Sequence, residues 1–126
     1  LLPSPYEVRL YDLPSLFAGK LHAVLCRAWK SRVKGRDLYD YIFYLAKGAE
    51  VNLLHLKARL TDSGFIREDF VLNRDSLIGL LNERFAHIDY EQAKHDVLPF
   101  IRDKSKLDLW GAEFFTEVTR NLKVKE

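Results

Sequence analysis

Apolar residues along most of this 126-residue chain recur at intervals of three and four, the spacing of an amphipathic helix. The clearest stripe lies between residues 14 and 28. Its members are Phe17, Leu21, Val24, Leu25 and Ala28. Pro14 suits a first helical turn, because its ring fixes φ near the helical value and no hydrogen bond is needed from its nitrogen there. We therefore expect a helix that begins near Pro14.

The same spacing predicts further helices, giving five or six in all. They are expected over residues 36–47, 53–63, 74–88, 90–97 and 105–122. Side chains suited to N-caps precede three of them: Asn52, Asn73 or Asp75, and Asp89. Pro99 should end the fifth helix near Val97. Gly79 lies inside the fourth helix, where glycine costs about 1 kcal/mol relative to alanine, so close packing there would be unsurprising.

Three other stretches do not follow helical spacing. Residues 6–11 alternate in a period of two after Pro3 and Pro5, which predicts one short strand that needs a partner for its backbone groups. Residues 65–72 suit either a short strand or an extended loop, and residues 124–126 should fray. The predicted fold class is mainly α, a helical bundle of five or six helices with one short N-terminal strand. In the last helix, Leu109, Ala112, Phe115 (or Phe114) and Val118 should face inward.

Composition places the chain in one domain with one core, since 48% of its residues are apolar and eight are Phe. No apolar run approaches the roughly 20 residues of a membrane span, and no signal peptide is visible. Cys26 stands alone on the apolar side of the first helix, so we expect a buried thiol and a reducing, cytoplasmic location. The chain holds no Met, and we expect it to be part of a longer gene product.

Charge is concentrated where the first two predicted helices meet. The formal net charge is only +2, but residues 27–36 hold five cations and no anion. Such a cluster can bind the phosphates of a nucleotide or of RNA, or it can be a solvated helix end. Asp37 and Asp40 follow on one face of the second helix. Taken alone, they suit a helix whose positive end is complemented by Asp37 and whose Arg36 pairs with Asp40.

Other candidate chemistry is sparse. The four histidines are scattered, and no spacing suggests a metal site. His95 and Asp96 are neighbours on a predicted helix, where consecutive side chains point about 100° apart, so they do not form an acid–base pair. The second helix carries several aromatic residues: Tyr39, Tyr41, Phe43 and Tyr44. They suit core packing better than a stacking platform for a base, although both readings stay open.

Two stretches resemble the distal motifs of the AbiEii/AbiGii nucleotidyltransferase family. They are Ala18-Gly19-Lys20-Leu21-His22-Ala23 and Lys34-Gly35-Arg36-Asp37-Leu38-Tyr39-Asp40, and the stretch from Asp96 to Ile101 fits one branch of the family. Members include bacterial toxins of toxin–antitoxin and abortive-infection systems, with a nucleotidyltransferase core followed by a helical region. The family's early motifs, a Gly-Ser pair and a carboxylate pair on a strand, do not occur in these residues.

The resemblance implies roles for individual residues. Lys20 and Asp37 would be catalytic, with Lys20 on the triphosphate and Asp37 orienting or deprotonating the attacking group, or positioning Lys20. Nucleotide binding would fall to Lys34, Arg36 and Arg27, with Asp40 in support. The family implies Mg²⁺ and a nucleoside triphosphate for the full-length protein, neither held tightly by these residues alone.

The same resemblance implies a domain organisation and partners. Residues 1–11 would be a strand left from, or docking to, a missing nucleotidyltransferase core, and residues 12–126 a helical C-terminal domain. Expected partners are that core, and an RNA acceptor or a cognate antitoxin, with no membrane. Without the early motifs, these residues alone should be inactive. The alternative functions are a helical nucleic-acid-binding module and a protein-interaction module.

Overall fold

The computed structural model describes residues 13–30 and 32–126. In order, its elements are α2 (Leu13–Lys30), α3 (Gly35–Ala46), β1 (Glu50–Asn52), α4 (Leu53–Asp62), α5 (Arg74–Phe85), α6 (Tyr90–Val97), the 3₁₀ helices η1 (Leu98–Phe100) and η2 (Lys104–Leu109), α7 (Ala112–Thr119) and β2 (Lys123–Lys125). The mainly helical class is confirmed. The count of five or six helices is too low once these 3₁₀ helices are included.

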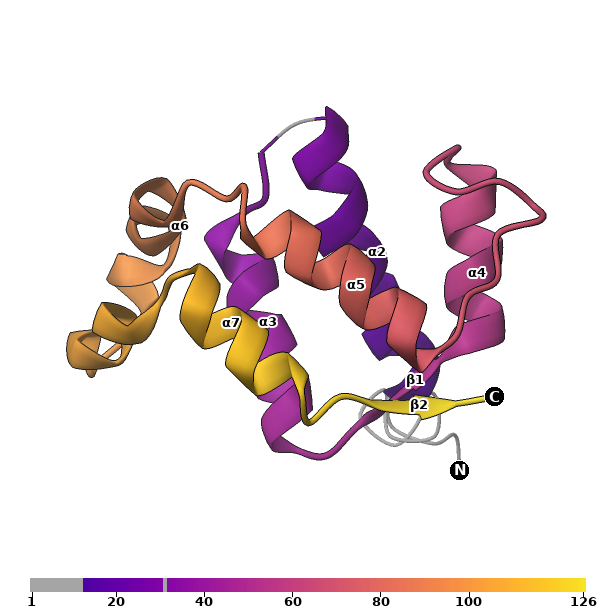
Figure 1. Cartoon of the computed structure of the whole chain (residues 1–126). Helices are drawn as coiled ribbons and strands as arrows, with labels where there is room; N and C mark the ends of the chain where they lie inside the picture. Colours follow the sequence, from indigo (N-terminus) through magenta and orange to yellow (C-terminus); the bar gives the residue numbers. More distant parts are fainter. Residues whose placement is uncertain (1–12, 31) are drawn as a thin grey trace, which may run out of the picture.

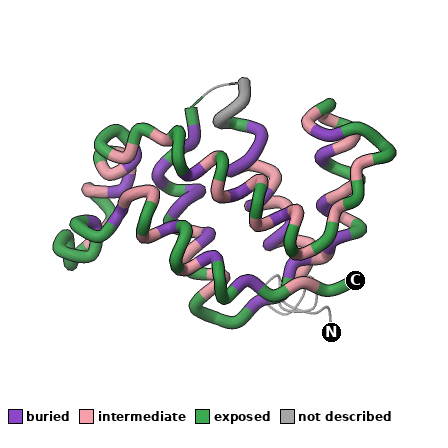
Figure 2. The backbone as a smooth tube through the Cα atoms, viewed as in Figure 1, coloured by how far each residue is buried: buried purple, intermediate pink, exposed green. Residues whose placement is uncertain are grey.

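The helices pack around α2 and α3, with α4 and α6 at opposite ends of the molecule (Figure 1). Buried residues line the inner sides of α2, α3, α5 and α7, and exposed residues cover their outer sides (Figure 2). The predicted stripe on α2 is part of this core: Phe17, Leu21, Val24 and Leu25 are fully buried. Cys26 is also buried, as predicted. Amphipathic spacing therefore accounts for most of the bundle.

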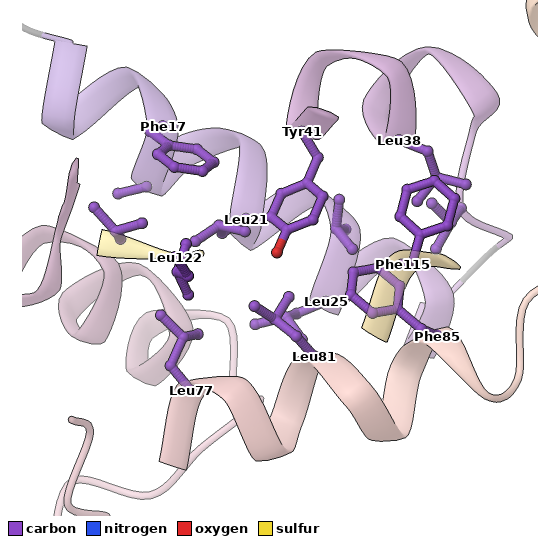
Figure 3. Close-up of a cluster of buried hydrophobic side chains, with 14 of the residues drawn as sticks. Phe17, Leu21, Leu25, Leu38, Tyr41, Leu77, Leu81, Phe85, Phe115 and Leu122 are labelled. Atoms are coloured by element: carbon purple, nitrogen blue, oxygen red, sulfur yellow. The ribbon is translucent and has the colours of Figure 1, made fainter. Parts of the chain in front are cut away.

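Tyr41 occupies the centre of the core, between the side chains of α2 and those of α5 (Figure 3). Its hydroxyl lies 2.8 Å from Thr119 Oγ1, which donates in turn to the Phe115 carbonyl. Burial raises the pKa of Tyr41 well above its usual value, so the phenol stays neutral. The aromatic residues of α3 are thus divided, because Tyr41 is core whereas Tyr39 and Phe43 are each 48% exposed.

Local capping sets the starts of three helices, as predicted. The side chains of Asn52, Asn73 and Asp89 accept hydrogen bonds from the backbone N–H groups of the first turns of α4, α5 and α6. Between α4 and α5, residues 65–72 form neither helix nor strand, so the extended-loop alternative holds. An added Cβ at Gly79 would meet nothing within 4 Å, so the expectation of close packing there is wrong.

The C-terminal part differs most from the prediction. Residues 105–122 were expected to form one helix, but η2 ends at Leu109 and α7 begins at Ala112. The break places Trp110 against Phe115, with ring centroids 5.5 Å apart, and leaves Leu109 65% exposed rather than inward. The free energy gained by burying the Trp110 ring therefore exceeds what a continuous helix would gain at Gly111, because glycine is a poor helix former.

A second difference lies at the end of the chain. Residues 124–126 were expected to fray, but Lys123–Lys125 pairs in parallel with Glu50–Asn52. This two-stranded sheet joins the segment between α3 and α4 to the segment that follows α7 (Figure 1). The strand predicted over residues 6–11 lies outside the described residues.

Candidate functional site

The turn between α2 and α3 has no side-chain cap of its own. Lys34 is the N-cap residue of α3 in an extended conformation, and its side chain makes no capping hydrogen bond. The cap comes from α6 instead, because the Gly35 N–H donates to Asp96 Oδ2 at 2.8 Å. A carboxylate at this position satisfies a free N–H and complements the positive end of the helix.

Asp96 also holds the basic turn in place. Arg32 donates to both of its carboxylate oxygens, at 2.6 and 2.7 Å. The Arg32 guanidinium, together with the Gly35 N–H, lowers the pKa of Asp96 to about 2. The carboxylate is therefore ionised at neutral pH, and α6 is fixed to both sides of the turn.

Gly35 lets α3 approach α6 closely at this point. A Cβ added to Gly35 would lie 1.9 Å from the Ala93 carbonyl oxygen and 3.0 Å from the Asp96 Cβ. The contact distance requires glycine, since no larger residue fits between these two backbones.

The two helices, the turn and α6 line a cavity of about 430 Å³, the cationic cavity, which opens to solvent. Its lining residues are Lys20, Arg27, Lys34, Arg36, Asp37, Asp40 and Asp96. All six residues singled out in the sequence line this one cavity, although they come from two helices and the turn between them.

Two ion pairs cross the cavity from α2 to α3. Lys20 Nζ lies 2.7 Å from Asp40 Oδ2, and Arg27 donates to Asp37 Oδ2 at 2.8 Å. Asp37 is buried, with 6% of its surface exposed, whereas the Lys20 and Asp40 side chains are each more than a third exposed. The expected pairing of Arg36 with Asp40 is wrong, because the Lys20 ammonium takes that carboxylate.

Lys34 and Arg36 differ from the other cations of the cavity. Both are exposed, and neither forms an ion pair with any residue that the structure describes. The Arg36 guanidinium instead lies over the Phe100 ring, 5.7 Å from its centroid. These two side chains are therefore the cations best placed to meet an anionic ligand.

Asp96 is the residue of this site that sequence reasoning missed. Rejecting an acid–base pair with His95 was sound, since His95 is exposed and does not line the cavity. The partner of Asp96 lies on another element, at the start of α3. The match of residues 96–101 to a branch of the family was the one signal that pointed to it.

The carboxylates of the cavity do not fit a magnesium site. Asp37, Asp40 and Asp96 each hold a cationic side chain, and no group of three or more His, Cys, Asp or Glu residues in the described ranges could hold a metal ion. Likewise, none of the helices over residues 13–30 and 32–126 has the length and apolar character of a membrane span.

Comparison with known proteins identifies the family. No curated protein and no solved structure matches the chain. Residues 2–116, which are most of its length, match the family described as "Nucleotidyl transferase AbiEii toxin, Type IV TA system". The resemblance seen in the sequence is therefore confirmed, and the chain belongs to the AbiEii nucleotidyl transferase toxin family.

Proposed function

We propose that this chain is the helical part of a nucleotidyltransferase and that its cationic cavity holds the phosphates of a nucleoside triphosphate while a nucleotide is transferred to an RNA or protein acceptor. One observation carries the proposal. Residues from the stretches that resemble the family's distal motifs converge on a single open cavity of about 430 Å³, together with Arg27: they are Lys20, Lys34, Arg36, Asp37, Asp40 and Asp96. Four cations and three carboxylates line it, which leaves one positive charge in excess.

The contacts suggest a separate role for each residue in binding the triphosphate. Lys34 and Arg36 meet the phosphates first, because both are exposed and unpaired among the described residues. Lys20 moves from Asp40 to the triphosphate, an exchange of one anionic partner for another in a half-exposed position. Asp37 is a positioning residue, because its buried carboxylate holds Arg27 at the cavity wall. Phosphoryl-type transfer depends mainly on such positioning and charge stabilisation.

Magnesium is implied by the family, and this chain's carboxylates do not form a site for it. The metal-holding groups would come from a nucleotidyltransferase core outside these residues. Residues 1–126 alone are accordingly expected to bind nucleotide phosphates but to transfer nothing. The family description names a toxin of a type IV toxin–antitoxin system, which supports a cognate antitoxin as a partner of the intact protein. We propose in addition, from the resemblance seen in the sequence, that the intact protein is bacterial and cytoplasmic and acts in abortive infection.

Titration of the intact protein with a nucleoside triphosphate tests this proposal. The double variant Lys34→Ala/Arg36→Ala should bind at least about tenfold more weakly at low salt, since hydrogen bonds to charged groups contribute about 1.5–3 kcal/mol each. Folding should be preserved, because both side chains are exposed. Isothermal titration calorimetry gives the dissociation constants.

The matched control is Lys123→Ala/Lys125→Ala, which removes the same charge from exposed positions on β2. This variant should bind the nucleotide as the unchanged protein does. An equal loss in both double variants would indicate general attraction of polyanions, and no loss in the first would exclude the cavity as the phosphate site.

A further inference from the structure

A second, smaller cavity adjoins the cationic cavity. It measures about 260 Å³ and is lined by Arg36, Tyr39, Asp40, Val97, Phe100 and Ile101. We call it the aromatic cavity. Arg36 and Asp40 line both cavities, so the two are neighbours along α3.

The lining of the aromatic cavity differs in character from that of its neighbour. Two of its residues are aromatic and unusually exposed, Tyr39 at 48% and Phe100 at 75%. Val97 and Ile101 add apolar surface beneath them. Exposed rings beside a charged pocket are the arrangement on which nucleic-acid bases stack, because every base offers an apolar π-face.

Arg36 connects the two environments. Its guanidinium lies 5.7 Å from the Phe100 ring centroid and also lines the cationic cavity. A planar cation held over a ring can stack on a flat ligand and still reach its phosphates. The volume is below the roughly 300–1,000 Å³ usual for a whole small molecule, so it suits one part of a larger ligand.

We propose that the aromatic cavity binds the base of the nucleotide whose phosphates occupy the cationic cavity, with Tyr39 and Phe100 as the stacking residues. This inference rests on the proposed function, because it deepens the description of the same site. Apolar ring surface at one end and cations at the other match the two ends of a nucleoside triphosphate.

A larger pocket of about 620 Å³ shares Tyr39, Phe100 and Ile101 with the aromatic cavity. Its other lining residues, among them Arg102, Lys106 and Trp110, form what we call the far groove. A single-stranded nucleic acid would use this whole path, whereas a mononucleotide base would use the aromatic cavity alone. The two occupants therefore differ in their dependence on residues of the far groove.

The test compares two ligands of the intact protein by calorimetry, inorganic tripolyphosphate and each of the four common ribonucleoside triphosphates. At least one nucleotide should bind about tenfold or more tightly than tripolyphosphate. Tyr39→Ala and Phe100→Ala should each weaken that nucleotide's binding about five- to tenfold or more, and leave tripolyphosphate binding within twofold.

Phe43→Ala is the matched aromatic control, since Phe43 lies on the same helix and is also 48% exposed. Leu109→Ala is the control for the far groove, where Leu109 is 65% exposed. Neither variant should change nucleotide binding. Both ring substitutions remove exposed side chains, so circular dichroism should show the same helical content as the unchanged protein.

Four results would overturn the inference. The first is nucleotide binding by the ring variants within twofold of the unchanged protein. The second is an equal loss of tripolyphosphate binding, which would place the effect of the substitutions on the phosphate site. The third is weaker binding of a single-stranded oligonucleotide alone in the ring variants and in Leu109→Ala, which would make the path a nucleic-acid groove. Failure of the unchanged protein to bind either ligand would refute the proposed function, and this subsite with it.

Discussion

Replacing Lys20 with alanine in the intact protein should lower the rate of nucleotide transfer at least about 100-fold, the usual cost of removing one charge-stabilising group at a reacting centre. Thermal stability should change little. The Lys20–Asp40 pair is more than a third exposed on both sides, and such surface pairs contribute at most about 1 kcal/mol. A transfer assay with α-labelled nucleotide gives the rate, and a thermal melt gives the stability.

Lys94→Ala provides the comparison for this variant. Lys94 also pairs with a carboxylate, Glu91 at 3.4 Å, but it does not line the cationic cavity. The Lys94→Ala protein should transfer nucleotide at a rate within twofold of that of the unchanged protein. Full transfer by a folded Lys20→Ala protein would remove Lys20 from the catalytic residues. Asp37→Ala is less informative, because removing a buried carboxylate that pairs with Arg27 should also lower stability.

The largest stability effect is expected at Gly35. In Gly35→Ala, the new Cβ would lie 1.9 Å from the Ala93 carbonyl oxygen, so α3 and α6 must separate. Overpacking against backbone should cost about 3 kcal/mol or more, a large part of the stability of a domain. The Asp96 cap on the Gly35 N–H would be stretched as well. Urea unfolding followed by circular dichroism measures the loss.

Gly79→Ala is the matched control, because Gly79 also lies within a helix but an added Cβ there meets nothing within 4 Å. Relative to glycine, alanine favours a helix by about 1 kcal/mol, so this variant should be slightly more stable than the unchanged protein. Equal stability of Gly35→Ala and the unchanged protein would contradict the close contact of α3 with α6.

Much of the fold was predictable because it depends on short-range interactions. Asn52 and Asp89 cap helices through backbone groups three residues away, and such caps are visible in a local window. The apolar stripe of α2 likewise follows from spacing alone. The strand at Lys123–Lys125 was not predictable in this way, since four α-helices and two 3₁₀ helices separate it in sequence from its partner strand.

The candidate site was likewise predictable only where patterns close together in the sequence determine it. Lys20 and Asp37 were singled out by their resemblance to family motifs, and their convergence follows from two helices joined by a short turn. Their partners were not foreseen, because a helical window places Asp40 beside Arg36 and not beside Lys20 on another helix. The cap that Asp96 provides for α3 was not predicted for the same reason, because Asp96 lies 61 residues from Gly35 in the sequence.

The position of a bound triphosphate tests the central claim most directly. A crystal structure of the intact protein with a non-hydrolysable nucleoside triphosphate would locate it. We predict phosphate oxygens within hydrogen-bond distance of Lys34 or Arg36, with the Lys20 ammonium turned from Asp40 towards the phosphates. A triphosphate bound elsewhere, with the cationic cavity filled by water and the Lys20–Asp40 pair intact, would contradict the account.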